Sequence, residues 1–287
     1  MNEIGFVGLG RMGQPIVKHL SENFMVSAVY NRTFDKVPSE LKRVAKNSPL
    51  EVAQSSDIIF LIVTDSAASR DVVDNILSGS IRGKLIVDMS TISFRQSLRN
   101  HEAVLKSGNN YMDCPVIGSV PAAVSGKLTA VAGGRKEDFS RITGMLKTFT
   151  GKQIYAGNAG SGIVLKLSNN LVMGSAMAAL AEAIAMSENM GITFETMTEA
   201  FQSGGAMTRI LDLKKEKIKS GNFSPEFSLK HQLKDLRYAI ELAEEMEIPH
   251  SVASSVESEY SLSRSRSEDP DMSYIVEFIR KMRVINE

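Results

Sequence analysis

The sequence is poor in the residues that form disulfides and most metal sites. Its 287 residues include one cysteine, four histidines and no tryptophan. A single cysteine, Cys114, excludes an internal disulfide and is typical of a reducing compartment. With so few thiols and imidazoles, we expect no structural zinc site and no other metal centre.

The chain also lacks an excess of charge of either sign. Its 33 Lys and Arg residues balance 33 Asp and Glu residues, so charge does not indicate nucleic acid or an anionic membrane as a partner. The first residues show no basic segment followed by a long apolar stretch, so we expect no signal peptide and a cytoplasmic protein. The apolar run around 171–186 contains Ser175 and Glu182 and is rich in Ala and Met, which favours a buried helix over a membrane span.

The first half of the chain alternates between short apolar runs and helical patterns. Strands are predicted at 4–8, 25–30, 57–63, 85–89, 111–115, 128–132 and 154–155, with helices at 15–20, 49–54, 72–77, 95–106 and 136–148. Strands that alternate with helices indicate βαβ units and a parallel sheet. Right-handed crossovers then predict an α/β, doubly wound fold for residues 1–162.

The second half, 163–287, is predicted to be helical throughout. The expected helices are 163–190, 194–203, 207–219, 229–246, 251–267 and 272–282, separated by glycine and proline residues. The first of them is long enough to join the two domains. A short Ser/Arg tract at 263–267 is assigned to the polar end of a helix.

A glycine-rich motif follows the first strand and opens the first helix. It reads Gly8, Leu9, Gly10, Arg11, Met12 and Gly13. Gly8 would allow a tight turn, Gly10 would let a pyrophosphate approach the backbone, and Gly13 would let helix and strand pack closely. The helix N-terminus offers amides and a positive dipole end to phosphates. We therefore assign these six residues to a dinucleotide site; the alternative is a glycine-rich turn without a ligand.

The end of the second strand bears on the choice of cofactor. An acid there would bind the ribose hydroxyls of NAD, whereas an arginine accepts the 2′-phosphate of NADP. The sequence has Asn31, Arg32 and Thr33 at this position, which favours NADPH. NAD stays open because Asp35 would serve it if the strand ended later, and Arg32 could be a solvated loop charge.

Lys166 is the most informative residue of the second half. It is the only charged residue between Ile163 and Ala181, in a helix that is apolar on nearly every side and is therefore expected to be buried. Asn170 follows four residues later on the same face. This pattern indicates a proton donor with a polar neighbour facing a ligand. The alternative is a lysine that extends from the first turn to water.

Four motifs together resemble the β-hydroxyacid dehydrogenase family, which includes 3-hydroxyisobutyrate dehydrogenase and the glyoxylate/succinic semialdehyde reductases. They are the glycine motif at 5–15, Asp113-Cys114-Pro115-Val116-Ile117-Gly118-Ser119 with the following Gly126-Lys127-Leu128-Thr129, Gly160-Ser161-Gly162 with Lys166 and Asn170, and Phe227-Ser228-Leu229 with Lys234-Asp235-Leu236. The stretch Asp88-Met89-Ser90-Thr91-Ile92 matches a further family loop. The resemblance covers essentially the whole chain.

The resemblance implies a Rossmann domain followed by an all-helical, 6-phosphogluconate-dehydrogenase-like C-terminal domain. It also implies a homodimer or homotetramer, a small hydroxy or aldehyde acid as substrate, and hydride transfer with NADP or NAD. The implied catalytic residues are Lys166 and Asn170. The implied substrate-binding residues are Gly118, Ser119 and Ser90. The implied further cofactor contacts are Val63, Thr64, Thr91 and Lys234.

One position departs from the family pattern. The family commonly has Ser-Gly-Gly where this chain has Ile117, Gly118 and Ser119, and an isoleucine side chain cannot donate a hydrogen bond to a substrate carboxylate. This departure leaves the substrate open. NADPH-dependent reduction of glyoxylate or succinic semialdehyde is the first hypothesis, because Asn31, Arg32 and Thr33 disfavour NAD. NAD-dependent oxidation of 3-hydroxyisobutyrate is the second. An imine reductase and a non-catalytic cofactor-binding protein are remoter alternatives.

Overall fold

The computed structural model describes residues 3–264 and 269–284. It divides into two compact units, Met1–Lys166 and Leu167–Glu287, called here the sheet unit and the helical unit. The sequence places the boundary between 162 and 163, at the start of the long helix. The structure places it later because the first turn of that helix packs with the sheet unit.

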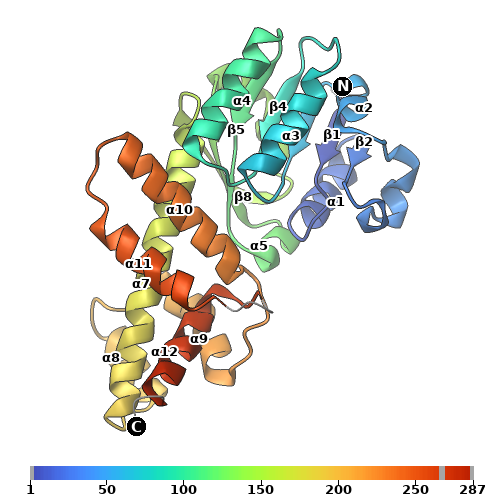
Figure 1. Ribbon diagram of the computed structural model, residues 1–287. Helices are drawn as coiled ribbons and strands as arrows, with labels where there is room; N and C mark the ends of the chain where they lie inside the picture. Colours follow the sequence, from blue (N-terminus) through green and yellow to red (C-terminus); the bar gives the residue numbers. More distant parts are fainter. Residues whose placement is uncertain (1–2, 265–268, 285–287) are drawn as a thin grey trace. The chain divides into compact units, whose positions relative to one another are not determined.

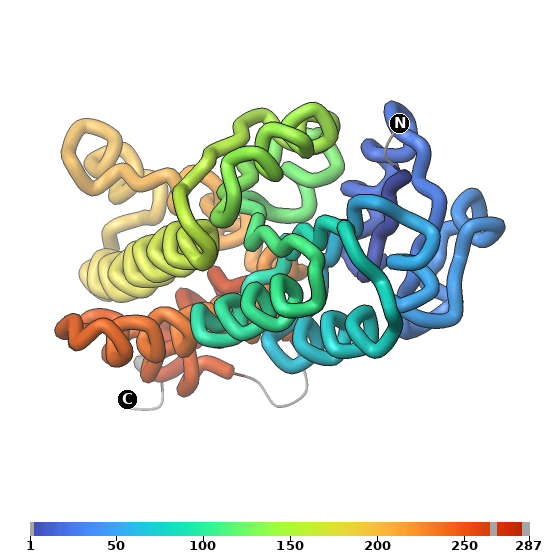
Figure 2. Tube along the Cα trace, turned by 90° about the horizontal axis from the view of Figure 1, so that it is seen from above, coloured from blue at the N-terminus to red at the C-terminus, as the bar shows by residue number. Residues whose placement is uncertain are grey.

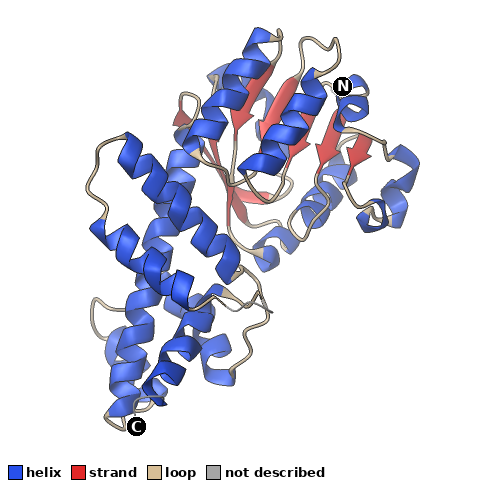
Figure 3. Ribbon diagram, viewed as in Figure 1, coloured by secondary structure: helices blue, strands red, loops and turns tan. Residues whose placement is uncertain are grey.

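The sheet unit alternates strands and helices as expected (Figures 1 and 3). The strands are β1 Ile4–Val7, β2 Val26–Tyr30, β3 Ile58–Leu61, β4 Leu85–Asp88, β5 Asn110–Asp113, β6 Val116–Ile117, β7 Leu128–Gly133 and β8 Thr150–Gly157. The α-helices are α1 Gly13–Asn23, α2 Pro49–Gln54, α3 Ser66–Leu77, α4 Phe94–Lys106, α5 Val120–Val124 and α6 Lys136–Leu146, with 3₁₀ turns η1 Phe34–Lys36 and η2 Ser39–Val44. The two 3₁₀ turns, β6 and α5 were not predicted, because elements this short leave no clear periodicity.

Both faces of the sheet are buried, as a doubly wound fold requires. Along β3, Ile58 and Phe60 contribute to one apolar cluster, with α1 and α6. The alternate residues Ile59 and Leu61 contribute to a second cluster, with α2, α3 and α4. Figure 1 shows α3 and α4 side by side over one face. Period-two alternation between two apolar faces explains why the strands read as continuous apolar runs.

The sheet is parallel over most of its width but not throughout. Its order is β2-β1-β3-β4-β5-β7-β6, with β8 paired to β7. The first five strands in this order are parallel, and so are β7 and β8. Strand β7, however, runs antiparallel to β5 and β6. The prediction of a doubly wound, parallel-rich sheet is confirmed, and the reversal at β7 is a local departure from it: the chain turns back through α5 between β6 and β7.

The helical unit consists of helices packed around one apolar core. It contains most of α7 Ser161–Asn189, then α8 Phe194–Gln202, α9 Arg209–Ser220, α10 Leu229–Glu245, α11 Ser251–Leu262, the 3₁₀ turn η3 Met272–Tyr274 and α12 Ile275–Val284. Its core gathers buried side chains from α7 to α12, among them Met177, Leu236 and Tyr260. Helix α11 ends at Leu262 with Ser263 as its C-cap, while residues 265–267 of the Ser/Arg tract lie outside the described residues.

Helix α7 runs without a break (Figure 2), but it is not buried on nearly every side. Met177 and Ile184 are fully buried in the helical core, whereas Val172 and Met186 are 68% and 66% exposed. By length and composition alone, α7 is the one helix among the described residues that could cross a membrane. Its inner face is part of the helical core, which accounts for its apolar composition.

Candidate functional site

The glycine motif forms a close turn between β1 and α1. Gly8 has φ of +100°, and a Cβ there would lie 1.9 Å from the carbonyl oxygen of Ile62. A Cβ on Gly13 would lie 1.9 Å from the carbonyl oxygen of Gly8. At Gly10, by contrast, nothing lies within 4 Å of a Cβ. Two glycines are therefore required by packing, and the third leaves exposed backbone that a ligand can approach.

The start of α1 fits a phosphate. Its N-cap residue, Met12, makes no side-chain capping bond, and its first turn contains no acid. The neighbouring helices α2, α3 and α4 are capped by the side chains of Ser48, Asp65 and Ser93. A helix N-terminus without a side-chain cap leaves amides and a positive dipole end for an anion. Together with the open backbone at Gly10, this end of the sheet fits a dinucleotide pyrophosphate.

Asn31 holds the glycine loop in place. Its Oδ1 accepts a hydrogen bond from the Leu9 amide at 2.9 Å, and its Nδ2 donates to the Thr33 carbonyl at 2.7 Å. Gln14 adds a second brace, since its Nε2 donates to the carbonyl oxygens of Leu9 and Lys36. The sequence assigns Asn31 to the cofactor, and these contacts show in addition that it supports the glycine loop.

The residues expected at the ribose end lie on the surface beside this loop. Arg32 and Thr33 are exposed, as is Arg11. Strand β2 ends at Tyr30, and Asp35 lies in the 3₁₀ turn Phe34–Lys36 rather than at the strand tip. Arg32 is therefore nearer the strand end than Asp35 is.

A buried carboxylate organises the two loops after β3 and β4. Asp88 accepts from the Ser90 amide at 2.9 Å, from Ser69 Oγ at 2.6 Å and from the Tyr111 hydroxyl at 3.0 Å. Ser90 Oγ in turn accepts from the Val63 amide at 2.9 Å. Burial raises the pKa of Asp88 against the opposing effect of these hydrogen bonds.

This network places four predicted residues on adjacent loops. Ser90 is 1% exposed, and the bond it accepts holds the loop of Val63. Thr91 is half-buried, and the exposed Thr64 donates to the Asp65 carboxylate at 2.9 Å. The sequence missed Asp88 as an organising residue, although an acid directly after an apolar strand was a visible signal.

The predicted carboxylate-binding segment lies between β6 and α5. Gly118 is exposed with φ of +127°, and a Cβ there would lie 2.7 Å from Leu128 Cδ2. Ser119 is half-buried and precedes α5 without making a side-chain capping bond. Ile117 ends β6, paired with Thr129. Gly118 is thus required by its backbone conformation, and its exposed backbone can approach a ligand.

Lys166 lies in the second turn of α7 and is 6% exposed. The alternative of a lysine that extends into water does not fit this burial. Asn170, one turn later, is 1% exposed. The helix geometry puts both side chains on one face, as the spacing predicts.

Asn170 and Lys234 meet at one buried carboxylate, that of Asp235. Asn170 Nδ2 donates to Asp235 Oδ2 at 2.6 Å, and Lys234 Nζ lies 2.8 Å from Asp235 Oδ1. Asp235 is 1% exposed. Lys234 Nζ also lies 4.8 Å from the centre of the Tyr238 ring, so Tyr238 contacts a site residue. Asp235 is in a quoted family motif, but nothing in the sequence indicated that it joins the two site residues.

No group of three or more His, Cys, Asp or Glu side chains within 3–264 and 269–284 is placed to hold a metal ion.

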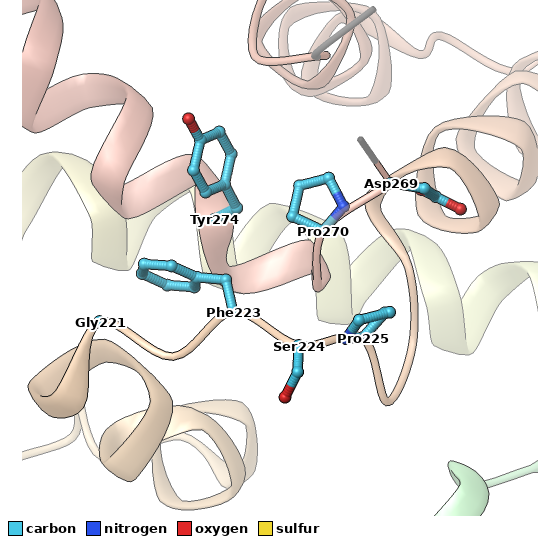
Figure 4. A pocket seen from close by; sticks show the side chains of 7 residues that line it. All are labelled: Gly221, Phe223, Ser224, Pro225, Asp269, Pro270 and Tyr274. Atoms are coloured by element: carbon cyan, nitrogen blue, oxygen red, sulfur yellow. The ribbon is translucent and has the colours of Figure 1, made fainter. Parts of the chain in front are cut away.

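A pocket of about 530 Å³ occurs in the helical unit, lined by Phe223, Tyr274, Pro225, Pro270, Gly221, Ser224 and Asp269 (Figure 4). Its two aromatic rings meet edge to face, 5.5 Å apart. None of the residues assigned above lines it.

Two family models match consecutive parts of the chain. One, described as the NAD binding domain of 6-phosphogluconate dehydrogenase, matches residues 3–157. The other, described as NAD-binding of NADP-dependent 3-hydroxyisobutyrate dehydrogenase, matches residues 160–279. The fold and the glycine loop thus define an NAD(P)-dependent oxidoreductase.

Individual relatives belong to the same class of oxidoreductase or share its fold. The chain is 30% identical over 287 residues to glyoxylate/succinic semialdehyde reductase 1 of Arabidopsis thaliana, covering 98% of this chain and 99% of that protein. It is 31% identical over 277 residues to the cytokine-like nuclear factor N-PAC of Mus musculus, but covers 50% of that protein and 95% of this chain. The structure of Mycobacterium tuberculosis 3-hydroxyisobutyrate dehydrogenase with L-serine shares the fold, with a TM-score of 0.90, 23% identity, and coverage of 98% and 99%. The chain belongs to the β-hydroxyacid dehydrogenase family.

Proposed function

We propose that the protein is an NADPH-dependent reductase of a small aldehyde or keto acid, with glyoxylate or succinic semialdehyde as the leading substrates. The observation that carries this proposal is the buried Lys166, which shares one helix face with Asn170. Burying an ammonium in an apolar helix is costly, so a lysine kept at this position is a strong candidate for a functional group. Similarity to a plant glyoxylate/succinic semialdehyde reductase over nearly the full length of both chains supports the substrate class.

The bound nicotinamide supplies the hydride. Lys166 Nζ donates a proton to the carbonyl oxygen as the carbonyl carbon is reduced, and the neutral amine then regains a proton from water. The side-chain amide of Asn170 has two hydrogens, of which one is donated to Asp235. The other donates to the substrate oxygen and orients it. The backbone at Gly118 and Ser119 holds the substrate carboxylate, while Lys234 contacts the cofactor.

The preference for NADPH rests on Arg32. It is exposed, it follows the end of β2 closely, and the acid Asp35 lies farther along in a 3₁₀ turn. A guanidinium makes paired, charge-assisted hydrogen bonds to a phosphate. The 2′-phosphate of NADPH provides such a partner, and NADH does not.

The second candidate is NAD-dependent oxidation of 3-hydroxyisobutyrate. The description of the second family model names a 3-hydroxyisobutyrate dehydrogenase, which supports this substrate, but it names NADP and not NAD as the cofactor. A third candidate is a protein that binds the cofactor without catalysis, because one similar protein is named as a nuclear factor rather than an enzyme. The buried Lys166 favours an enzyme over a non-catalytic binding protein. It also argues against the remoter alternative of an imine reductase.

The decisive experiment follows the loss of reduced-nicotinamide absorbance with purified protein. NADPH and NADH are offered separately with glyoxylate, succinic semialdehyde and methylmalonate semialdehyde. We expect turnover with NADPH well above that with NADH, and with one of the first two acids. A preference for NADH with methylmalonate semialdehyde would instead support the second candidate. Cofactor binding without turnover on any aldehyde would indicate a non-catalytic protein.

We further propose that the protein is a cytoplasmic homodimer or homotetramer that associates through the helical unit. Support for the association comes from α7, where Val172, Ala179 and Met186 recur every seven residues and are exposed. Such an apolar stripe is suited to a second helix. Sedimentation of the wild type and of Val172→Lys tests this. We expect the variant to shift toward monomer, and a monomeric wild type would contradict the proposal.

A further inference from the structure

Asp113, at the end of β5, is a buried acid that the proposed reaction does not use. It is 1% exposed. Its Oδ1 accepts a hydrogen bond from the Gly160 amide at 2.7 Å, and its Oδ2 accepts from the Ile163 amide at 3.0 Å. These amides belong to the residue before α7 and to its first turn. A carboxylate from the sheet therefore caps the helix that carries Lys166.

The surroundings leave this carboxylate little room to move. A Cβ on Gly133 would lie 2.8 Å from both of its oxygens, and a Cβ on Gly162 would lie 2.8 Å from Oδ2. Each Cβ would also lie close to a backbone carbonyl oxygen, 2.7 Å from that of Asn158 or 2.5 Å from that of Val131, so a side chain at either position would disturb Asp113 together with the backbone around it. Two glycines from distant parts of the chain thus make space for one carboxylate.

We propose that Asp113 is a positioning residue for Lys166: it anchors the N-terminus of α7 to the end of β5 and so places the lysine side chain. Ile163, whose amide it accepts, precedes Lys166 by three residues, about one helical turn. Asp113, Ile163 and Lys166 all belong to the sheet unit. The inference rests on the proposed function, in which the ammonium must meet a carbonyl oxygen within hydrogen-bond reach.

The charge state of the anchor is set by its environment. Burial raises the pKa of Asp113 to about 7, against the lowering effect of the amides of Gly160 and Ile163. When protonated, the carboxyl has one oxygen that is a poor acceptor, so it holds the two amides less well. The anchor therefore weakens as the pH falls through about 7.

Other titrating groups face the same region. Tyr111 and Cys114 are on its own strand and its extension, and burial raises the pKa of both away from neutrality. On β4, Asp88 is opposite Asp113 in the sheet register, and its pKa is raised as well. From α7, Asp113 meets backbone amides, with Lys166 the next charged residue along the helix. Protonation of Asp88 and protonation of Asp113 would each lower kcat as the pH falls. A variant of Asp113 is needed to separate the two effects.

The test compares the wild type with Asp113→Asn, which keeps the shape but offers one acceptor oxygen. We expect kcat for aldehyde reduction to fall about tenfold to a hundredfold, because small displacements of a catalytic group have effects of this size. The KM for NADPH should stay within about twofold, and the decline of kcat below about pH 7 should disappear. Hydrogen exchange at the amides of 160–166 should become faster.

The matched control is Asp138→Asn. Asp138 is also a nearly buried acid of the sheet unit, in the first turn of α6, and its carboxylate faces Arg135 at 3.7 Å. Its variant should leave kcat, its pH profile and exchange at 160–166 unchanged. If Asp113→Asn behaved like this control, the proposal would be wrong.

Two further results keep the outcomes apart. If Asp113→Asn does not fold, the wild type decides: kcat and the exchange protection of 160–166 must fall together below about pH 7. Protection that is independent of pH would overturn the anchor. A wild type that turns over none of the aldehydes would refute the proposed function, and the exchange data would still report whether Asp113 anchors α7.

Discussion

Asn170 donates a hydrogen bond of 2.6 Å to Asp235, across 65 positions of the sequence. The other oxygen of the same carboxylate lies 2.8 Å from Nζ of Lys234. One buried acid thus holds two residues that the sequence assigns to catalysis and to cofactor binding. The first prediction concerns this acid.

Asp235→Asn should lower kcat about tenfold to a hundredfold, because an amide in place of the carboxylate can no longer accept from Asn170 and pair with Lys234 equally well. The KM for NADPH should rise with it, since Lys234 loses its ion pair. Steady-state kinetics measure both effects. Glu244→Gln, an exposed change on the same helix, serves as the control. A variant that matches this control would exclude a role for Asp235.

Lys166→Ala should lower kcat about a hundredfold to ten-thousandfold, the usual contribution of a positioned proton donor. The Kd for NADPH, measured by nucleotide fluorescence, should stay near the wild-type value. Lys166→Arg should be impaired as well, because a guanidinium does not release its proton. Lys152→Ala, an exposed change on β8, should have no effect. Near-normal turnover in Lys166→Ala would show that another group donates the proton.

Gly10→Ala and Gly13→Ala should fail in different ways. Alanine at Gly10 meets no atom within 4 Å, so thermal unfolding should be nearly unchanged while nucleotide binding is lost. Alanine at Gly13 would bring its Cβ to 1.9 Å from a backbone oxygen, so this variant should be strongly destabilised. Calorimetry and nucleotide titration separate the two effects. Full cofactor affinity in Gly10→Ala would place the pyrophosphate elsewhere.

Arg32→Ala should raise the KM for NADPH and leave that for NADH unchanged. A hydrogen bond to a charged group contributes about 1.5–3 kcal/mol, and about 1.4 kcal/mol corresponds to a tenfold change in affinity. We therefore expect an increase of about tenfold to a hundredfold. Arg43→Ala, in the nearby turn Ser39–Val44, is the control. Equal effects on both cofactors would argue against a 2′-phosphate contact.

The helical unit should lose stability in acid through Asp271. Burial alone would raise its pKa, but Lys214 at 2.8 Å and amides such as that of Glu226 at 3.0 Å lower it below its ordinary value of 3.8. Since the folded pKa lies below the unfolded one, the stabilisation is complete above about 3.8 and is lost as pH falls through the folded value.

Thermal unfolding between pH 7 and pH 2 measures this effect. Asp271→Asn should be destabilised at neutral pH by up to about 3–5 kcal/mol, the range for a buried charge that loses its partner. The loss should fall toward the lower end, because Lys214 keeps a second carboxylate, Glu226, at 3.5 Å. The variant should also show a flatter decline in acid than the wild type. The same acid slope in both proteins would assign the titration to other carboxyls.

The local features were accessible from the sequence because their causes are local. Alternation of apolar residues along β3 and the spacing of Gly8, Gly10 and Gly13 reflect strand and turn geometry within a few residues. Lys166 was conspicuous because a charge in an apolar helix needs compensation. The exposed Val172 and Met186 were misjudged, because composition does not say which face of an apolar helix is covered.

The fold class, the glycine turn after β1 and the placement of Lys166 and Asn170 on one helix face could be predicted from the sequence, since each depends on residues that are near one another in the chain. Only the tertiary structure decided that β7 runs antiparallel to β5, that Asp235 joins Asn170 to Lys234, and that Asp113 caps α7 from 47 positions away. Burial and hydrogen-bond partners arise from long-range packing, which residue type and spacing do not encode locally.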